Sequence, residues 1–303
     1  MDLYFLGTGG GVPSKERNVS SIALRMLPER GAIWLFDCGE GTQHQILRTP
    51  IKLSKLEKIF ITHLHGDHIY GLPGLLASRS FQEDESSVTI YGPTGIRSFV
   101  ETALSVAGTH LRYPLSIVEV AEGTVFEDDH VVVRAAKLNH GVPSYGYRIA
   151  ERDRPGALDA DRLKAEGVPP GPLYSRLKNG ETVKLADGRV VNGDDYIGPP
   201  KKGKKLAILG DTRPSKAAYT LAESVDVLIH EATFMNDDAE RAHRYFHSTT
   251  VDAAKIARSA GAAALIVSHI SSRYKGEEKQ FLQEARSVFP NSFLAKDFWT
   301  YEI

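Results

Sequence analysis

Short apolar runs separated by glycine and proline dominate the first half of the chain, with longer amphipathic stretches between some of them. Short runs rich in branched and aromatic side chains are typical of β-strands. This pattern predicts strands at residues 3–6, 21–27, 32–36, 58–61, 88–91, 115–120, 131–138 and 145–149. It predicts helices at residues 39–48, 71–81 and 94–107.

From about residue 205 onward, apolar runs and amphipathic stretches alternate. Strands are predicted at 206–209, 227–229, 264–267 and 293–295, and helices at 215–224, 250–260 and 277–288. Strands that first cluster and then alternate with helices indicate sheets covered by helices. We therefore expect a mixed α/β protein.

The segment from Glu151 to Lys205 interrupts this pattern and contains 14 Gly or Pro residues. A loop of this length inside a compact domain is uncommon and usually functional. A solvated insertion without a role would have the same composition. We expect residues 1–303 to form a single domain, into which residues 151–205 are inserted as a flexible arm.

Composition excludes several classes of protein. The chain is 42% apolar and 25% charged, which is usual for folded proteins and excludes a mainly disordered chain. The one cysteine, Cys38, excludes a disulfide framework and a thiolate zinc site. No apolar run approaches the roughly 20 residues that span a bilayer. The N-terminus lacks the basic start of a signal peptide, so we expect a cytoplasmic protein without membrane association.

Charge is unevenly distributed along the chain. The total net charge of −1 gives no global basic field for nucleic acid. Residues 148–205, however, contain 13 Lys or Arg and 9 Asp or Glu, a net charge of +4. The rest of the chain therefore carries −5.

The strongest chemical signal is His63-Leu64-His65-Gly66-Asp67-His68, directly after the predicted strand 58–61. A tight turn after a strand can direct alternate side chains at one point, so His63 and His65 could share a metal ion. Asp67 and His68 could then serve a second ion. This density of ligand-type side chains would be costly without a metal.

Two ions need further ligands, and three candidates stand at the ends of other apolar strands. His140 follows the strand 131–138, Asp211 follows 206–209, and His269 follows 264–267. A carboxylate commonly bridges two ions, and Asp211 is the candidate bridge. Each residue alone favours a structural interpretation, but together they predict one site.

This spacing resembles the metallo-β-lactamase superfamily, whose HxHxDH motif and later His, Asp and His ligands match all seven positions. The resemblance implies a four-layer αββα sandwich with two Zn²⁺ per subunit between the sheet edges. It implies one ion on His63, His65 and His140, the other on Asp67, His68 and His269, and a bridge by Asp211. Such a centre indicates a hydrolase but does not select its substrate.

Other segments narrow the substrate class. The Gly-rich segment from Gly7 to Asn18 fits neither a dinucleotide fingerprint nor a P-loop. With Lys15 and Arg17 it could still bring backbone N–H groups and two cations to a phosphate, although a simple turn is the alternative. His247 lies outside the metal set and could protonate the leaving alkoxide of a phosphodiester, with Glu231 orienting it.

Together with His230-Glu231-Ala232-Thr233, His247-Ser248-Thr249 and the Gly/Pro-rich insertion, these motifs resemble the short form of the ribonuclease Z family over essentially the whole chain. The resemblance implies an endoribonuclease that removes the 3′ trailer of precursor tRNA, leaving a 3′-hydroxyl on the tRNA and a 5′-phosphate on the trailer. It implies that Asp67 accepts a proton, that His247 donates one, and that the protein is a homodimer.

The same resemblance implies that the arm grips the elbow of the tRNA. The net charge of +4 over residues 148–205 agrees with this role, because phosphate contacts need a local basic surface. Such contacts position an RNA without reading its sequence. We expect them from four lysines at the C-terminal base of the arm: Lys201, Lys202, Lys204 and Lys205.

Two alternatives remain open. Another di-zinc hydrolase of this fold, such as a small-molecule phosphodiesterase or a glyoxalase-II-like thioesterase, would keep the seven ligands but would not need a basic arm. A non-catalytic RNA-binding scaffold would need neither intact ligands nor His247. A serine hydrolase is excluded by motif, since no Gly-x-Ser-x-Gly occurs.

Overall fold

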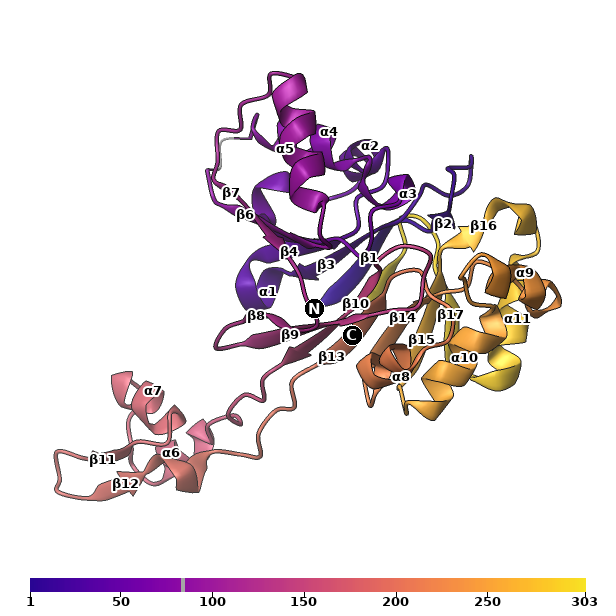
Figure 1. The fold of residues 1–303 in the computed structure, drawn as a ribbon. Coiled ribbons are helices and arrows are strands. Elements are labelled where there is room, and N and C mark those ends of the chain that lie inside the picture. Colours follow the sequence, from indigo (N-terminus) through magenta and orange to yellow (C-terminus); the bar gives the residue numbers. More distant parts are fainter. Residues whose placement is uncertain (83–84) are drawn as a thin grey trace. The chain divides into compact units, whose positions relative to one another are not determined.

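The computed structural model describes residues 1–82 and 85–303, which divide into two compact units (Figure 1). The first unit consists of Met1–Glu127, Val132–Ile149 and Lys205–Ile303. The second unit consists of Asp128–Val131 and Ala150–Lys204.

Two seven-stranded sheets form the centre of the first unit. One has the order β18-β1-β3-β4-β5-β6-β7, and the other has the order β17-β15-β14-β13-β10-β9-β8. The strands of the first sheet are β1 (Asp2–Gly7), β3 (Ser21–Met26), β4 (Ala32–Phe36), β5 (Leu56–Phe60), β6 (Val88–Gly92), β7 (Leu115–Glu119) and β18 (Thr300–Glu302). Those of the second are β8 (Gly123–Glu127), β9 (Val131–Lys137), β10 (Tyr145–Glu151), β13 (Lys205–Leu209), β14 (Val227–Glu231), β15 (Ala264–Ser268) and β17 (Ser292–Leu294).

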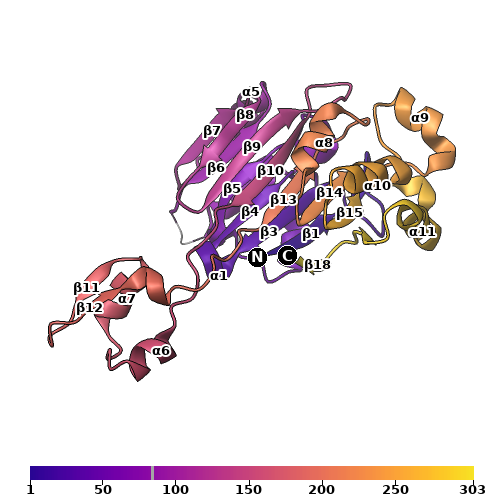
Figure 2. The ribbon, with the colours of Figure 1, turned by 90° about the horizontal axis from the view of Figure 1, so that it is seen from below.

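Helices cover the outer face of each sheet (Figures 1 and 2). The first sheet is covered by α2 (Thr42–Leu47), α4 (Leu72–Arg79) and α5 (Ile96–Val106), and the second by α8 (Lys216–Ala222), α10 (Thr250–Ser259) and α11 (Glu278–Val288). The short helices are α1 (Leu27–Arg30), α3 (Gly66–Ile69) and α9 (Ala239–Arg244). Each helical layer shares an apolar core with its sheet. This arrangement confirms the four-layer αββα sandwich predicted from the sequence.

The apolar runs of the sequence explain the centre of the sandwich. β13, β14, β15 and β17 pair in parallel, and every residue of β14 and β15 is buried. Strands covered on both faces require such continuous apolar runs. Aromatic rings fill the space between the sheets, with centroids 5.0 Å apart for Phe36 and Phe60 and 5.2 Å apart for Phe60 and Tyr147. The parallel strands leave their carboxyl ends at one edge, where ligands bind in α/β folds.

Several elements of the first unit lie outside the runs that the sequence pattern predicted. They include β8, β18, α3 and α9. No residue of β8 is buried, so this edge strand has no apolar signature and depends on its antiparallel pairing with β9. Among the helices that the structure describes, none is long and apolar enough to cross a membrane.

The second unit has secondary structure and a small core of its own. It contains α6 (Ala160–Ala165), α7 (Pro172–Lys178), β11 (Thr182–Lys184) and β12 (Val190–Asn192). Buried apolar side chains from these elements pack together, among them Leu163, Leu177, Val183 and Val191. The pattern analysis found only a loop here because these few apolar residues are dispersed among glycine, proline and charged residues.

Candidate metal centre

All seven predicted ligand side chains lie in turns or helix starts that follow strands of the first unit. The first sheet supplies His63, His65, Asp67 and His68 after β5, and the second supplies His140, Asp211 and His269 after β9, β13 and β15. The fold brings these distant segments into contact. The Nε2 atoms of His68 and His269, 201 positions apart in the chain, are separated by 3.3 Å.

The seven side chains fall into two groups, and within each group the donor atoms lie within 4.8 Å of one another. The groups are His63, His65, His140 and Asp211, and Asp67, His68 and His269; a third such group joins Asp211 and His269 with His247. Asp211 Oδ2 lies 3.7 Å from His63 Nε2, and Asp211 Oδ1 lies 3.7 Å from His68 Nε2. Asp211 Oδ2 is also 3.3 Å from His269 Nε2. The Asp211 carboxylate therefore faces both groups.

The chemistry of these donors fits a divalent metal. His63 Nε2 lies 3.1 Å from His65 Nδ1, which lies 3.3 Å from His140 Nε2, so ring nitrogens face one another. Burial and the neighbouring imidazoles lower the pKa of His63 well below its ordinary value, which leaves a neutral ring with a lone pair. Imidazole and carboxylate donors without thiolates suit zinc or manganese. The protein thus carries a metal site.

The electrostatic surroundings of His68 also favour a cation. Burial opposes a charge on its ring, yet Asp37 and Asp211 raise the pKa of His68 well above its ordinary value. Carboxylates that attract a proton so strongly attract a metal cation at the same place.

Asp37 is a functional residue that the sequence analysis missed. Its carboxylate accepts hydrogen bonds from His68 Nδ1 at 2.8 Å, from the Thr62 N–H at 2.7 Å and from Thr62 Oγ1 at 2.9 Å. A carboxylate on Nδ1 leaves Nε2 of His68 for a metal and fixes the ring. The sequence does contain a signal for Asp37. This residue stands directly after the predicted strand 32–36, just as the predicted ligands stand after other predicted strands.

The Gly-rich loop lies against two of the predicted metal ligands, Asp67 and His269. The Gly11 N–H donates to Asp67 Oδ2 at 2.8 Å. A Cβ atom at Gly10 would lie 2.7 Å from His269 Cε1, so only glycine permits this approach. Burial raises the pKa of Asp67, but hydrogen bonds from His269 and His68 outweigh it and hold this pKa well below its ordinary range. In this structure the loop's backbone N–H thus serves a carboxylate of the site.

His247 and Glu231 form a hydrogen-bonded pair beside the ligands. His247 Nδ1 lies 2.9 Å from Glu231 Oε1 and 3.8 Å from Asp211 Oδ2. Burial disfavours a charged His247, but the Glu231 carboxylate outweighs it and raises the pKa of His247 to about 9. Glu231 is itself buried and accepts from the Thr212 N–H at 3.0 Å. Glu231 therefore orients the His247 ring and favours its charged form.

Thr233, from the same segment as Glu231, links this pair to a ligand. Its Oγ1 donates to Glu231 Oε2 at 2.7 Å and lies 2.9 Å from His269 Nδ1. The Thr233 hydroxyl thus contacts both the carboxylate of Glu231 and the imidazole of His269. The motif His230-Glu231-Ala232-Thr233 contains this threonine, but its spacing gives no sign of the contact with His269.

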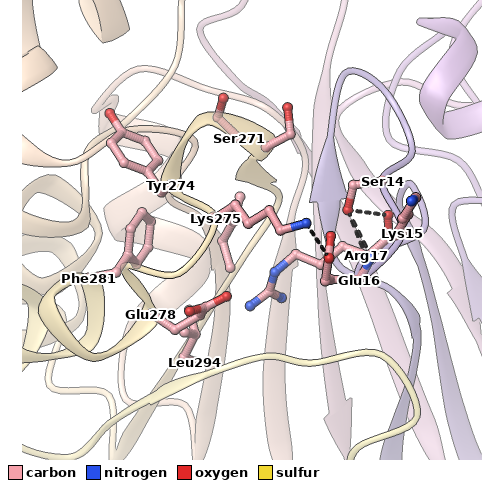
Figure 3. A pocket seen from close by; sticks show the side chains of 12 residues that line it. Ser14, Lys15, Glu16, Arg17, Ser271, Tyr274, Lys275, Glu278, Phe281 and Leu294 are labelled. Atoms are coloured by element: carbon pink, nitrogen blue, oxygen red, sulfur yellow. Dashed lines mark hydrogen bonds and ion pairs between the residues drawn. The ribbon is translucent and has the colours of Figure 1, made fainter.

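The two cations of the Gly-rich loop have different surroundings. Arg17 Nη1 donates to Thr8 Oγ1 and to the Ala295 carbonyl, each at 2.7 Å, so this part of its guanidinium is used inside the protein. Lys15 is exposed. Both belong to the lining of a cavity of about 280 Å³, where Lys275 Nζ pairs with Glu16 Oε1 at 2.5 Å (Figure 3).

The lysines predicted to contact phosphate occupy the end of the inserted segment. Lys201, Lys202 and Lys204 belong to the second unit, and Lys205 begins β13 of the first. The side chain of Lys202 is 86% exposed and its Nζ lies 3.2 Å from Asp153 Oδ2.

Comparison with known proteins relates the whole chain to one family. It is 60% identical over 304 residues to Ribonuclease Z of Bacillus licheniformis and to Ribonuclease Z of Geobacillus kaustophilus, covering 100% of the chain and 99% of each relative. The crystal structure of human tRNase Z, short form, has a TM-score of 0.73 and 30% identity, and the match covers 100% of this chain and 99% of that one.

Two further similarities concern the fold or only part of the chain. The metallo-β-lactamase fold protein YhfI of Bacillus subtilis has a TM-score of 0.70 at 18% identity, covering 99% of both chains. The family model described as anti-Pycsar protein Apyc1 matches residues 1–151. Both agree with the architecture of the first unit.

Asp37→Asn is expected to lower the affinity for divalent metal about 10- to 100-fold, because an amide holds His68 without the carboxylate's charge. Asparagine tolerates the left-handed backbone of this residue, whose φ is +57°. Competition with a chromogenic chelator measures the affinity. Asp237→Asn, at an exposed carboxylate, is the matched control. Unchanged affinity would mean that Asp37 serves only to fix the turn at Thr62.

Proposed function

The chain belongs to the ribonuclease Z family, and from this premise we propose that it is a zinc-dependent endoribonuclease that removes the 3′ trailer of precursor tRNA. Cleavage would leave a 3′-hydroxyl on the tRNA and a 5′-phosphate on the trailer. The observation that carries the proposal is the 60% identity to Ribonuclease Z over the full length. We also propose that the protein is located in the cytoplasm.

A small-molecule phosphodiesterase or a glyoxalase-II-like thioesterase could use the same seven donors. The full-length relatives favour the endonuclease over these alternatives. The His247–Glu231 pair supports it further, because an RNA leaving group is a poor one and needs a proton.

Two zinc ions fit the two donor groups. His63, His65 and His140 would hold one ion, Asp67, His68 and His269 the other, and Asp211 would contact both. When bound, such ions act as Lewis acids on a phosphoryl oxygen and lower the pKa of water. The protein's part is to hold these side chains in fixed orientation.

Proton transfer would fall to two side chains on the same site. Asp67 is the proposed proton acceptor: the Gly11 N–H fixes its carboxylate, which faces Nε2 of His68 and of His269 at the centre of the site. Glu231 favours the charged form of His247 and occupies its Nδ1, which leaves Nε2 to donate a proton to the departing 3′-oxygen of the tRNA. Acid and base are thereby separate groups.

Substrate selection would belong to the basic inserted segment, residues 151–205, acting as an RNA-binding exosite. Its net charge of +4 over residues 148–205 supports phosphate contacts by Lys201, Lys202, Lys204 and Lys205. In the Gly-rich loop, exposed Lys15 would contact phosphate, with Arg17 beside it. These contacts would recognise a folded RNA by shape.

A homodimer is the assembly that the family resemblance implies. An apolar groove of about 590 Å³ on the first unit supports such an interface. Its lining includes Leu47 and Phe81, whose side chains are 77% and 78% exposed. Exposed apolar patches of this kind commonly mark protein interfaces.

The direct test is incubation of the purified protein with a precursor tRNA carrying a 3′ trailer, with and without a chelator. A single chelator-sensitive cut after the discriminator nucleotide is expected. End-group analysis of the two products shows on which side the phosphate remains. Cleavage of a small phosphodiester without cleavage of the precursor would refute the RNA substrate while keeping the metal hydrolase.

His247→Ala is expected to keep the metals and lower kcat on precursor tRNA at least about 100-fold, which is the usual contribution of a general acid. A p-nitrophenyl phosphodiester should lose far less activity, because p-nitrophenolate leaves without a proton. His243→Ala, at an exposed histidine of α9, is the control. A rate near that of the wild type on RNA would remove His247 from the acid role.

Replacing residues 155–200 by an Asn-Gly turn, together with Lys201→Gln, Lys202→Gln and Lys204→Gln, should abolish tRNA cleavage and spare small diesters. The ends can be joined because Arg154 and Lys201 form an antiparallel bridge, with N–H to carbonyl distances of 3.0 and 2.9 Å. Steady-state kinetics on both substrates is the measurement, and retained metal content is the folding control. Equal loss on both substrates would show that the segment is structural.

A further inference from the structure

Arg213, which the sequence analysis did not single out, contacts the residues that precede His140 and His247. Its Nη2 donates to Asn139 Oδ1 at 3.1 Å, and its backbone N–H donates to the Asn139 carbonyl at 2.9 Å. Its guanidinium carbon lies over the ring of Phe246, 4.2 Å from the centroid. One half-buried side chain thus joins the two segments that supply His140 and His247.

Phe246 has an unfavourable backbone conformation. Its φ is +63°, in the left-handed region that residues with bulky side chains avoid. Such a conformation persists only when surrounding contacts hold it. The Phe246 N–H donates to the His243 carbonyl at 3.3 Å, and the guanidinium of Arg213 covers the ring. These contacts hold the turn just before His247.

This turn directs the backbone carbonyl of Phe246 toward the ring of His140. The Phe246 carbonyl accepts a hydrogen bond from His140 Nδ1 at 2.9 Å. A proton held on Nδ1 leaves a lone pair on Nε2, which lies 3.3 Å from His65 Nδ1 within the first donor group. A backbone carbonyl on the second ring nitrogen is a usual way to fix the tautomer and orientation of a metal-binding histidine.

We propose that Arg213 is a positioning residue that holds Phe246 in its left-handed conformation and thereby fixes the ring of His140 as a metal ligand. The inference rests on the proposed function in one respect, the assignment of His140 as a ligand. It predicts an effect on the protein without RNA. A guanidinium that served instead to bind substrate phosphate would affect only steps that involve RNA.

The test is Arg213→Met, which keeps an unbranched apolar side chain but removes the planar charge. In the metal-free protein, ring-nitrogen NMR should show His140 as a single Nδ1–H tautomer in the wild type and as a tautomer mixture in the variant. Zinc affinity, measured by chelator competition, should fall about 10-fold. Arg213→Lys retains a cation for the Phe246 ring. Its tautomer ratio and its zinc affinity should therefore lie between those of the wild type and those of Arg213→Met. Arg244→Met, at an exposed arginine of α9, should change neither readout.

The double variant Arg213→Met with Phe246→Gly tests whether the effect of Arg213→Met arises from backbone strain at residue 246. Glycine adopts positive φ without penalty and keeps the carbonyl, so it should restore the Nδ1–H tautomer and most of the zinc affinity. Failure to restore them would overturn the proposal. So would an Arg213→Met protein with unchanged tautomer and zinc affinity but a raised KM for precursor tRNA, which would make Arg213 a substrate contact. Because both readouts work without RNA, an error in the proposed substrate would leave them interpretable.

Discussion

The structure depends on a cluster of buried imidazole and carboxylate donor atoms that face one another and would share a cation. His63, His68, Asp211 and His269 are buried, and facing ring nitrogens in the site approach to between 3.1 and 3.3 Å. Removing so many polar groups from water is costly unless they are paired or coordinate a metal. The sandwich can tolerate this cluster because it lies at the sheet edge, where turns and not strands carry the ligands.

A second layer of hydrogen bonds turns this cluster into an ordered site. Asp37 holds His68, the hydroxyl of Thr233 lies against His269, and the Phe246 carbonyl holds His140. Each of these partners occupies Nδ1, so each of these rings presents Nε2. The arrangement has a conformational cost, because three of the five non-glycine residues with positive φ in the described chain are Asp37, Phe246 and His269. Such strain is about 1–3 kcal/mol per residue and collects at functional sites.

Chemistry and substrate selection are assigned to different parts of the chain. All seven ligand positions, His247 and Glu231 belong to the first unit. The second unit has a separate core around Leu163 and Leu177, and three of the four lysines proposed to contact phosphate stand at its C-terminal end. Because a metal centre of this type attacks any diester that reaches it, the proposed preference for tRNA needs recognition elsewhere in the protein. This division explains why the metal motif alone left the substrate class open.

The sequence by itself determined the parts of the protein that have a local signature. Apolar runs located most strands of both sheets, and His63 to His68 located the metal site, since four donors within six residues need no tertiary information. His140, Asp211 and His269 were found because each stands at the end of such a run. Relatives over the full length then confirmed the family that these motifs predicted.

Tertiary structure alone decided which side chains face one another across turns distant in the chain. It placed Asp37 behind His68, the Gly11 N–H on Asp67, and Arg213 over Phe246. It also built helices and a core in residues 150–204, where dispersed apolar residues leave no periodic pattern. Periodicity reports which face of an element is buried, but it carries no information about the partner that will lie against that face. The side chains that gather at this site could therefore be predicted from the sequence as candidate ligands, whereas the hydrogen bonds that orient them could not.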